Sequence, residues 1–101
     1  MDMAELAKSS DRASEFLKSL ANGQRLRILC LIMEGERPVG EIAETIGANQ
    51  SSVSQNLALM RREGLVVPRR SGQTIYYRLA DKKLVKLFQL LDDMFCALPR
   101  T

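Results

Sequence analysis

Side chains suited to hydrogen-bonding chemistry gather in residues 49–64, NQSSVSQNLALMRREG. The second half of this stretch is ordinary helix sequence, whereas the first half packs polar, uncharged side chains around one Val. Ser and Asn are mediocre helix formers, because their short side chains compete for nearby backbone groups. Such residues either cap the helix and face solvent, or meet a surface that is recognised by hydrogen bonds.

Double-stranded DNA is a surface of that second kind. Gln bonds adenine in a bidentate way, and Ser bonds either base edges or phosphates. With Asn49 as N-cap, most of the polar residues fall opposite an apolar face, and the positive end of the helix dipole attracts phosphate. That apolar face consists of Val53, Leu57 and Met60. The side chains predicted to contact DNA on this helix are Gln50, Ser51, Ser52, Ser54 and Gln55.

Basic side chains follow the polar stretch at places where backbone phosphates would lie. Further DNA contacts are predicted from Arg61, Arg62, Arg69, Arg70 and Gln73, with Arg78 nearby. The whole chain has 15 Lys+Arg against 12 Asp+Glu, a net charge of +3, which permits a polyanionic partner without demanding one. An aromatic content of 5% supplies a stacking platform for single strands poorly.

The composition argues against several other classes of protein. The 101 residues contain no His, which is the commonest general base and the commonest metal ligand. There is no Gly-rich phosphate loop either, so we expect neither an enzyme nor a cofactor. No apolar run approaches the roughly 20 residues that span a bilayer, and the N-terminus lacks the apolar core of a signal peptide. We expect one domain over residues 1–101, in the cytoplasm and without a membrane partner.

Helical periodicity predicts the elements that hold these side chains. A first helix over about residues 4–20 has an apolar stripe of Ala13, Phe16, Leu17 and Leu20. A second follows Asn22 as N-cap, carries Leu26, Leu29, Cys30 and Met33 at the same spacing, and stops at Glu34-Gly35. A third begins near Pro38 and ends at Gly47, with an apolar face of Val39, Ile42, Ala43 and Ile46.

The third helix and the polar-headed helix are joined by the short connection Gly47-Ala48-Asn49. This is a helix-turn-helix arrangement over about residues 38–63, in which the second helix enters the DNA major groove. From Leu65 the period changes to two, which predicts a hairpin wing over about residues 65–80. Pro68 suits an edge strand only, so we expect the wing to be two-stranded and exposed.

A last helix is predicted over about residues 81–98, with Asp81 as its N-cap. Its apolar stripe is unusually long and consists of Leu84, Leu87, Phe88, Leu91, Met94, Phe95 and Leu98. The expected fold is therefore mainly α with a small β-hairpin wing, a winged helix-turn-helix of four helices, two strands and a fifth helix. An apolar stripe this long on one face of the last helix needs a partner surface.

In these motifs the chain resembles the ArsR family of bacterial repressors. The similarity covers roughly residues 16–98 and includes LANGQRLRILCLI and VGEIAETIGANQSSVSQNLALMRREGLVVPRRSGQTIYYRL. One departure is Asn56, where many members carry His in the recognition helix; it bears on fine DNA preference more than on binding itself. The resemblance implies a homodimer through the terminal helices, about 4–20 and 81–98, that binds double-stranded operator DNA as an inverted repeat in its own promoter region.

Members of this family usually sense a metal or metalloid, and the ligand inventory argues against that here. The third helix, VGEIAETI, has no Cys, and the last helix has no His. Zinc prefers Cys and His ligands, typically four, and two cysteines per chain cannot fill such a site alone. We therefore expect no metal site.

Cys30 and Cys96 are the candidate redox-sensing residues. Both could be small hydrophobic residues in helices, which is the usual fate of free Cys. Cys96 falls off the apolar stripe, beside Gln89, Asp92 and Asp93, so we expect it to be partly accessible. Its acidic neighbours should raise the pKa of the thiol and slow its attack. Two thiols in different helices can also clip those helices together and move the recognition helices out of register.

These two positions are similar to those of the persulfide-responsive BigR and SqrR subgroup, which has one Cys within Arg-x-x-Ile-Leu-Cys and one near the end of the last helix. That resemblance implies that reactive sulfur species, or oxidants, bridge Cys30 and Cys96 and release operator DNA. The chain is also similar to HlyU-type regulators, which relieve silencing of virulence genes. Two alternatives stay open. One is a regulator with structural cysteines and a metal or no effector, and the other is a winged-helix protein-interaction module without DNA binding.

Overall fold

Five helices and three strands make up the part of the chain, residues 2–95, that the computed structural model describes. In chain order they are α1 (Met3–Leu20), α2 (Gly23–Ile32), β1 (Arg37–Pro38), α3 (Val39–Ile46), α4 (Gln50–Arg62), β2 (Val66–Ser71), β3 (Thr74–Leu79) and α5 (Lys82–Phe95). The predicted helices and hairpin are confirmed in type and order. The last helix was expected to reach residue 98, and Cys96 and Leu98 lie outside the described residues.

Side-chain caps start three of these helices where the sequence predicts them. The carboxamide or carboxylate oxygens of Asn22, Asn49 and Asp81 accept backbone N–H groups two or three residues on, at 3.1, 2.8 and 2.8 Å respectively. Each cap satisfies a donor that has no partner inside the helix. Gly47 ends α3 at φ 67°, a left-handed conformation that costs glycine little. The turn between α3 and α4 is therefore determined locally.

The wing is part of a three-stranded sheet, so the expectation of a two-stranded ribbon was wrong. β2 and β3 pair antiparallel, and β1 pairs antiparallel with the other side of β3, which gives the order β1-β3-β2. β1 has two residues, too few to show a period of two in the sequence. Pro38, at φ −78° and ψ 153°, keeps this segment extended just before α3. Pro68 lies in β2, an edge strand as expected.

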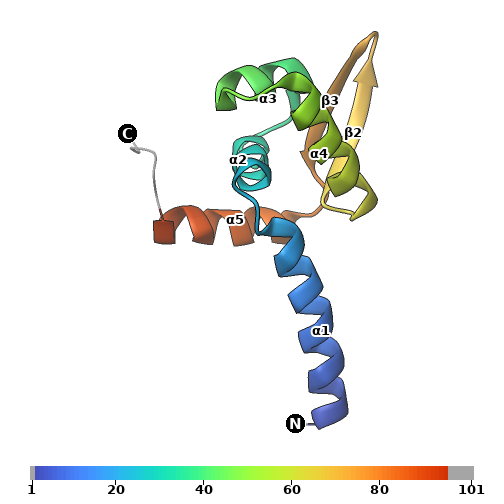
Figure 1. Cartoon of the computed structure of the whole chain (residues 1–101), viewed down its shortest axis with the longest axis vertical. Coiled ribbons are helices and arrows are strands. Elements are labelled where there is room, and N and C mark those ends of the chain that lie inside the picture. Colours follow the sequence, from blue (N-terminus) through green and yellow to red (C-terminus); the bar gives the residue numbers. More distant parts are fainter. Residues whose placement is uncertain (1, 96–101) are drawn as a thin grey trace.

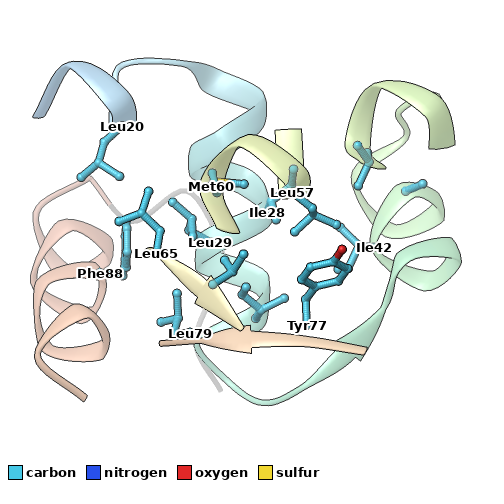
Figure 2. Close-up of a cluster of buried hydrophobic side chains, with 14 residues drawn as sticks. Leu20, Ile28, Leu29, Ile42, Leu57, Met60, Leu65, Tyr77, Leu79 and Phe88 are labelled. Carbon is cyan, nitrogen blue, oxygen red and sulfur yellow. The ribbon is translucent and has the colours of Figure 1, made fainter. Parts of the chain in front are cut away.

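One cluster of buried apolar side chains connects α2, α3, α4, the sheet and α5 (Figure 2). The predicted apolar face of α4 is confirmed, because Val53, Leu57 and Met60 are all fully buried. The predicted face of α2 was only partly right. Leu29 is buried, but the other three members of that stripe are half-buried, and Ile28 and Ile32 are buried instead. The reason is that α2 contacts α3, α4, α5 and β3, so apolar side chains on several faces of this helix are buried.

The terminal helices leave apolar side chains uncovered within one protomer. α1 projects away from the rest of the molecule (Figure 1), with Leu20 buried and Phe16 half-buried at its C-terminal end. Leu17, from the predicted stripe, is 58% exposed. On α5, Phe88 is buried, while Leu90, Met94 and Phe95 are exposed. None of the helices in residues 2–95 is both long and apolar enough to cross a membrane.

Candidate nucleic-acid interface

The exposed face of α4 carries four of the predicted DNA-contact residues. α3, α4 and the tip of the hairpin lie at one end of the molecule, and the start of α1 lies at the other (Figure 1). Gln50, Ser51, Ser54 and Gln55 are all exposed. Within residues 2–95, no side chain or backbone group forms a hydrogen bond with any of these four side chains. Their amide and hydroxyl groups are thus available to an external partner.

Ser52 lies on a different side of α4 from those four residues. It is half-buried, and its hydroxyl donates to Gln24 Oε1 of α2 at 3.0 Å. One turn later, the Asn56 amide donates to the same Gln24 oxygen. This side of α4 faces α2, so the geometry favours a positioning role for Ser52 over a contact with bases.

The exposed basic side chains lie on α4 and on the wing, as the sequence predicts. Arg61 and Arg62 form the last turn of α4, Arg70 lies in β2, and all three are exposed. No carboxylate within residues 2–95 pairs with any of them. Gln73 is exposed in the turn between β2 and β3. Because α4 packs against β2, these groups border the polar face of α4 on neighbouring elements.

Arg69 differs from the other predicted arginines because its charge is already paired. Its Nη2 donates to Glu36 Oε1 at 2.6 Å and its Nε to Glu36 Oε2 at 2.9 Å, and its guanidinium lies 4.7 Å from the centre of the Tyr76 ring. The hydrogen bond from Arg69 lowers the pKa of the Glu36 carboxyl below its ordinary value. Arg69 thus ties β2 to the segment just before β1. The two partners are 33 residues apart, and no local pattern predicts that they meet.

A network of polar side chains between α2 and α4 was also not predicted from the sequence. Gln24 and Arg25 open α2, a helix that is otherwise largely apolar, and both are half-buried. Gln24 accepts hydrogen bonds from α4, and Arg25 Nε donates to Asn56 Oδ1 at 3.1 Å. The available signal was the pair of polar residues in the first turn of a helix that the sequence places in the core.

Cys30 is the candidate sensing residue that the structure describes. It lies in α2, half-buried and packed against the core. Burial raises the pKa of its thiol, so the thiol is protonated and weakly nucleophilic at neutral pH. Cys96, its predicted partner, lies outside the described residues. Among the residues described, no three His, Cys, Asp or Glu side chains are grouped so as to hold a metal ion.

Comparison with known proteins connects this arrangement to bacterial regulators. Residues 22–67, which span α2 to β2, match the model of the arsR family of bacterial regulatory proteins. The transcriptional activator HlyU of Vibrio cholerae is 38% identical over 96 residues, covering 95% of this chain and 89% of that protein. The structure of reduced HlyU superposes with a TM-score of 0.85 at 39% identity, covering 91% of this chain and 97% of that one.

Two further relatives match most of the chain, one in sequence and one in structure. The biofilm growth-associated repressor of Xylella fastidiosa is 36% identical over 97 residues, covering 96% of this chain and 85% of that protein. The homodimeric winged helix-turn-helix domain of Mb0332 from Mycobacterium bovis has a TM-score of 0.76 at 41% identity, covering 87% of this chain and 82% of that one. On these similarities, and with a helix-turn-helix and wing in the matching positions, the chain belongs to the arsR family of bacterial regulatory proteins.

Proposed function

We propose that the protein is a cytoplasmic transcriptional repressor that binds an inverted-repeat operator as a homodimer, with α4 in the major groove. The observation that carries this proposal is the unengaged polar face of α4. It presents amides and hydroxyls to solvent, while the opposite face is fully buried. Neutral hydrogen-bonding groups of this kind suit base edges, and the exposed arginines on either side suit phosphates. The HlyU relative is a transcriptional activator and the Xylella relative is a repressor, so both support a role in regulation and the second supports repression.

Uncovered apolar side chains support the homodimer. Leu17 of α1 is 58% exposed, and Leu90, Met94 and Phe95 of α5 are 56%, 62% and 72% exposed. Clusters of large exposed apolar side chains mark interaction surfaces. The Mycobacterium bovis relative is homodimeric. A twofold axis would set two copies of α4 about 34–36 Å apart, which is one turn of DNA.

Selection from a random duplex library, followed by binding measurements in rising salt, tests this proposal. Gln55→Ala should relax the base preference of the selected duplexes, because it removes a bidentate group. Arg61→Ala should weaken binding to all sequences and reduce the salt dependence, because it removes a phosphate contact. Arg12→Ala, an equal loss of charge on the exposed part of α1, is the matched control. Duplex binding that ignores both salt and Arg61 would favour a protein-interaction module instead.

We further propose that Cys30 and Cys96 form a regulatory dithiol that responds to reactive sulfur species. Two observations support a link between thiol chemistry and α4. Cys30 lies in α2, which packs against both α4 and α5, and the HlyU relative has been solved in a reduced form. Because Cys30 is half-buried and packed against the core, whereas Cys96 is expected from the sequence to be partly accessible, we propose that Cys96 attacks first.

The proposed chemistry balances with glutathione persulfide as the oxidant. The Cys96 thiolate attacks the terminal sulfur of glutathione persulfide, which forms a Cys96 persulfide and releases glutathione. The Cys30 thiol then loses its proton and attacks the Cys96 Sγ, which forms the disulfide and releases hydrosulfide. The bridged form is the one proposed to release DNA.

Mass mapping of the persulfide-treated protein tests the switch. The expected result is a Cys30–Cys96 link and weaker operator binding by the linked form. Cys30→Ser and Cys96→Ser should each bind the operator normally when reduced but fail to respond. A linked form that binds the operator as tightly as the reduced form would exclude the switch and leave the DNA-binding proposal intact.

A further inference from the structure

We propose that Arg25 is a positioning residue that couples α1 to α4 and thereby sets the operator half-site spacing that the dimer accepts. This inference rests on the proposed DNA-binding homodimer. It concerns how the two recognition helices are placed relative to one another, and not which bases they read.

The Arg25 guanidinium makes contacts with both helices at once. Nη1 donates to the backbone carbonyl of Ser19, in the last turn of α1, at 2.9 Å. Nε donates to Asn56 Oδ1, in the middle of α4, at 3.1 Å. Nη1 also lies 3.5 Å from Glu63 Oε1, at the C-terminal end of α4. The Arg25 side chain is only 15% exposed, so these contacts are largely shielded from water.

The acceptor on α4 is itself held in place. The Asn56 amide donates to Gln24 Oε1, which directs its carbonyl oxygen toward Arg25. Ser52, one turn earlier, donates to the same Gln24 oxygen. Gln24 and Arg25, at the start of α2, therefore both form hydrogen bonds with the side of α4 that faces α2, and Arg25 also forms one with α1.

The attachment of α1 to the rest of the protomer is otherwise slight. α1 extends away from the body (Figure 1), and its contacts with the core come from Phe16 and Leu20 at its C-terminal end. A planar guanidinium fixes the directions of its bonds, which a lysine ammonium does not. Arg25 is thus placed to fix the angle between α1 and the body that carries α4.

A small change in that angle matters on the scale of DNA. With 18 residues and a rise of about 1.5 Å per residue, α1 is roughly 27 Å long. A rotation of about 10° at its C-terminal end moves its far end by roughly 5 Å, more than the roughly 3.4 Å between successive base pairs. In a dimer joined through α1, the same rotation would shift one α4 relative to the other. Loss of the Arg25 contacts should therefore blur the spacing preference.

The experiment measures binding to duplexes that share the half-sites selected by the wild-type protein but differ in spacer length by one or two base pairs. Wild type should prefer one spacer by roughly tenfold or more, on the order of the effect of a mismatched base pair. Arg25→Lys and Asn56→Ala should reduce that ratio to about threefold or less. Asn56→Asp keeps an acceptor for Arg25 but loses the donor to Gln24, so it should reduce the ratio less than Asn56→Ala does. Arg27→Lys, the same change at an exposed position of α2, should retain the wild-type ratio.

The ratio separates positioning from a general loss of stability. A variant that is merely less stable would weaken binding to all spacers alike, whereas the proposal requires the preference to flatten while a single half-site is still bound. An Arg25→Lys protein that keeps the wild-type preference would overturn the coupling and leave the proposed function standing. Wild-type indifference to spacer length would do the same. Wild-type protein that selects no duplex at all would overturn both.

Discussion

Arg69 and Arg70 are neighbours in β2 with equal charge, and we expect them to contribute very differently to DNA binding. Glu36 already neutralises Arg69 through two carboxylate oxygens, and the Tyr76 ring lies under the guanidinium. Arg70 is exposed, and no carboxylate within residues 2–95 pairs with it. A cation that is already paired displaces fewer counterions from DNA, because it must first leave its carboxylate.

The expected difference can be stated as a salt slope. Each phosphate contact contributes about 0.9 to the slope of log K against log salt. Arg70→Ala removes one contact from each protomer of a dimer, so the slope should become shallower by about 1.8. Arg69→Ala should change it little. Glu36→Gln releases Arg69 and should steepen the slope by up to about 1.8. Between about 50 and 200 mM salt, this variant should then lose roughly tenfold more affinity than the wild-type protein loses.

Fluorescence anisotropy of a labelled operator duplex, titrated with protein at several salt concentrations, measures these slopes. Arg12→Ala on α1 serves as the control for an equal loss of net charge. Equal slopes for Arg69→Ala and Arg70→Ala would contradict the expected difference, because Arg69 would then exchange Glu36 for a phosphate on binding. A Glu36→Gln slope identical to wild type would refute it from the other direction.

Three further predictions concern backbone conformation, pH and thiol reactivity. Gly47→Ala forces an alanine to φ 67° and should lower the free energy of unfolding in urea by about 1–2 kcal/mol. Gly40→Ala, inside α3 with ordinary space for a methyl group, should raise it by up to about 1 kcal/mol. Similar changes at both sites would contradict this. Arg69 depresses the folded-state pKa of Glu36 below its ordinary 4.5, so this pair stabilises the fold above that value and the benefit disappears as pH falls through the lower folded pKa. Thermal unfolding should therefore separate wild type from Glu36→Gln near neutral pH and bring them together in acid, and a pH-independent gap would argue against the pairing. Burial raises the pKa of the Cys30 thiol above 9.0. In a Cys96→Ser background, iodoacetamide should therefore alkylate Cys30 more slowly at neutral pH than it alkylates free cysteine. An equal rate, measured by mass spectrometry, would show that the thiol is not shielded.

The parts of the fold that the sequence predicts well are those determined by nearby residues. Caps at Asn22, Asn49 and Asp81 act on backbone groups within three residues, so they can be read directly from the chain. The buried face of α4 follows from a helical period within one element. The helix-turn-helix depends on the same local signals, because a glycine ends α3 and an asparagine starts α4. Its position could therefore be predicted without knowledge of tertiary structure.

Contacts between distant residues account for what the sequence did not predict. β1 exists because Arg37 and Pro38 pair with β3, and two residues carry no periodic signal of their own. Arg69 looked like a phosphate contact because its sequence neighbours are basic, and the carboxylate that neutralises it is 33 residues away. Composition and spacing cannot distinguish an exposed arginine from a paired one until both partners are placed in space.

In the proposed mechanism α2 is as important as α4, because it carries both Arg25 and Cys30. Arg25 and Cys30 are five residues apart on α2, which at about 1.5 Å per residue separates them by only about 7.5 Å along the axis. Additive effects are expected for sites more than about 7–10 Å apart that share no partners, and these two residues are at the lower edge of that range and share one helix. A helix with intact backbone hydrogen bonds moves as a unit. A bridge formed at Cys30 would therefore also displace the first turn of α2, where Gln24 and Arg25 bind α4 and α1. The proposed dithiol therefore need not touch the recognition helix in order to move it.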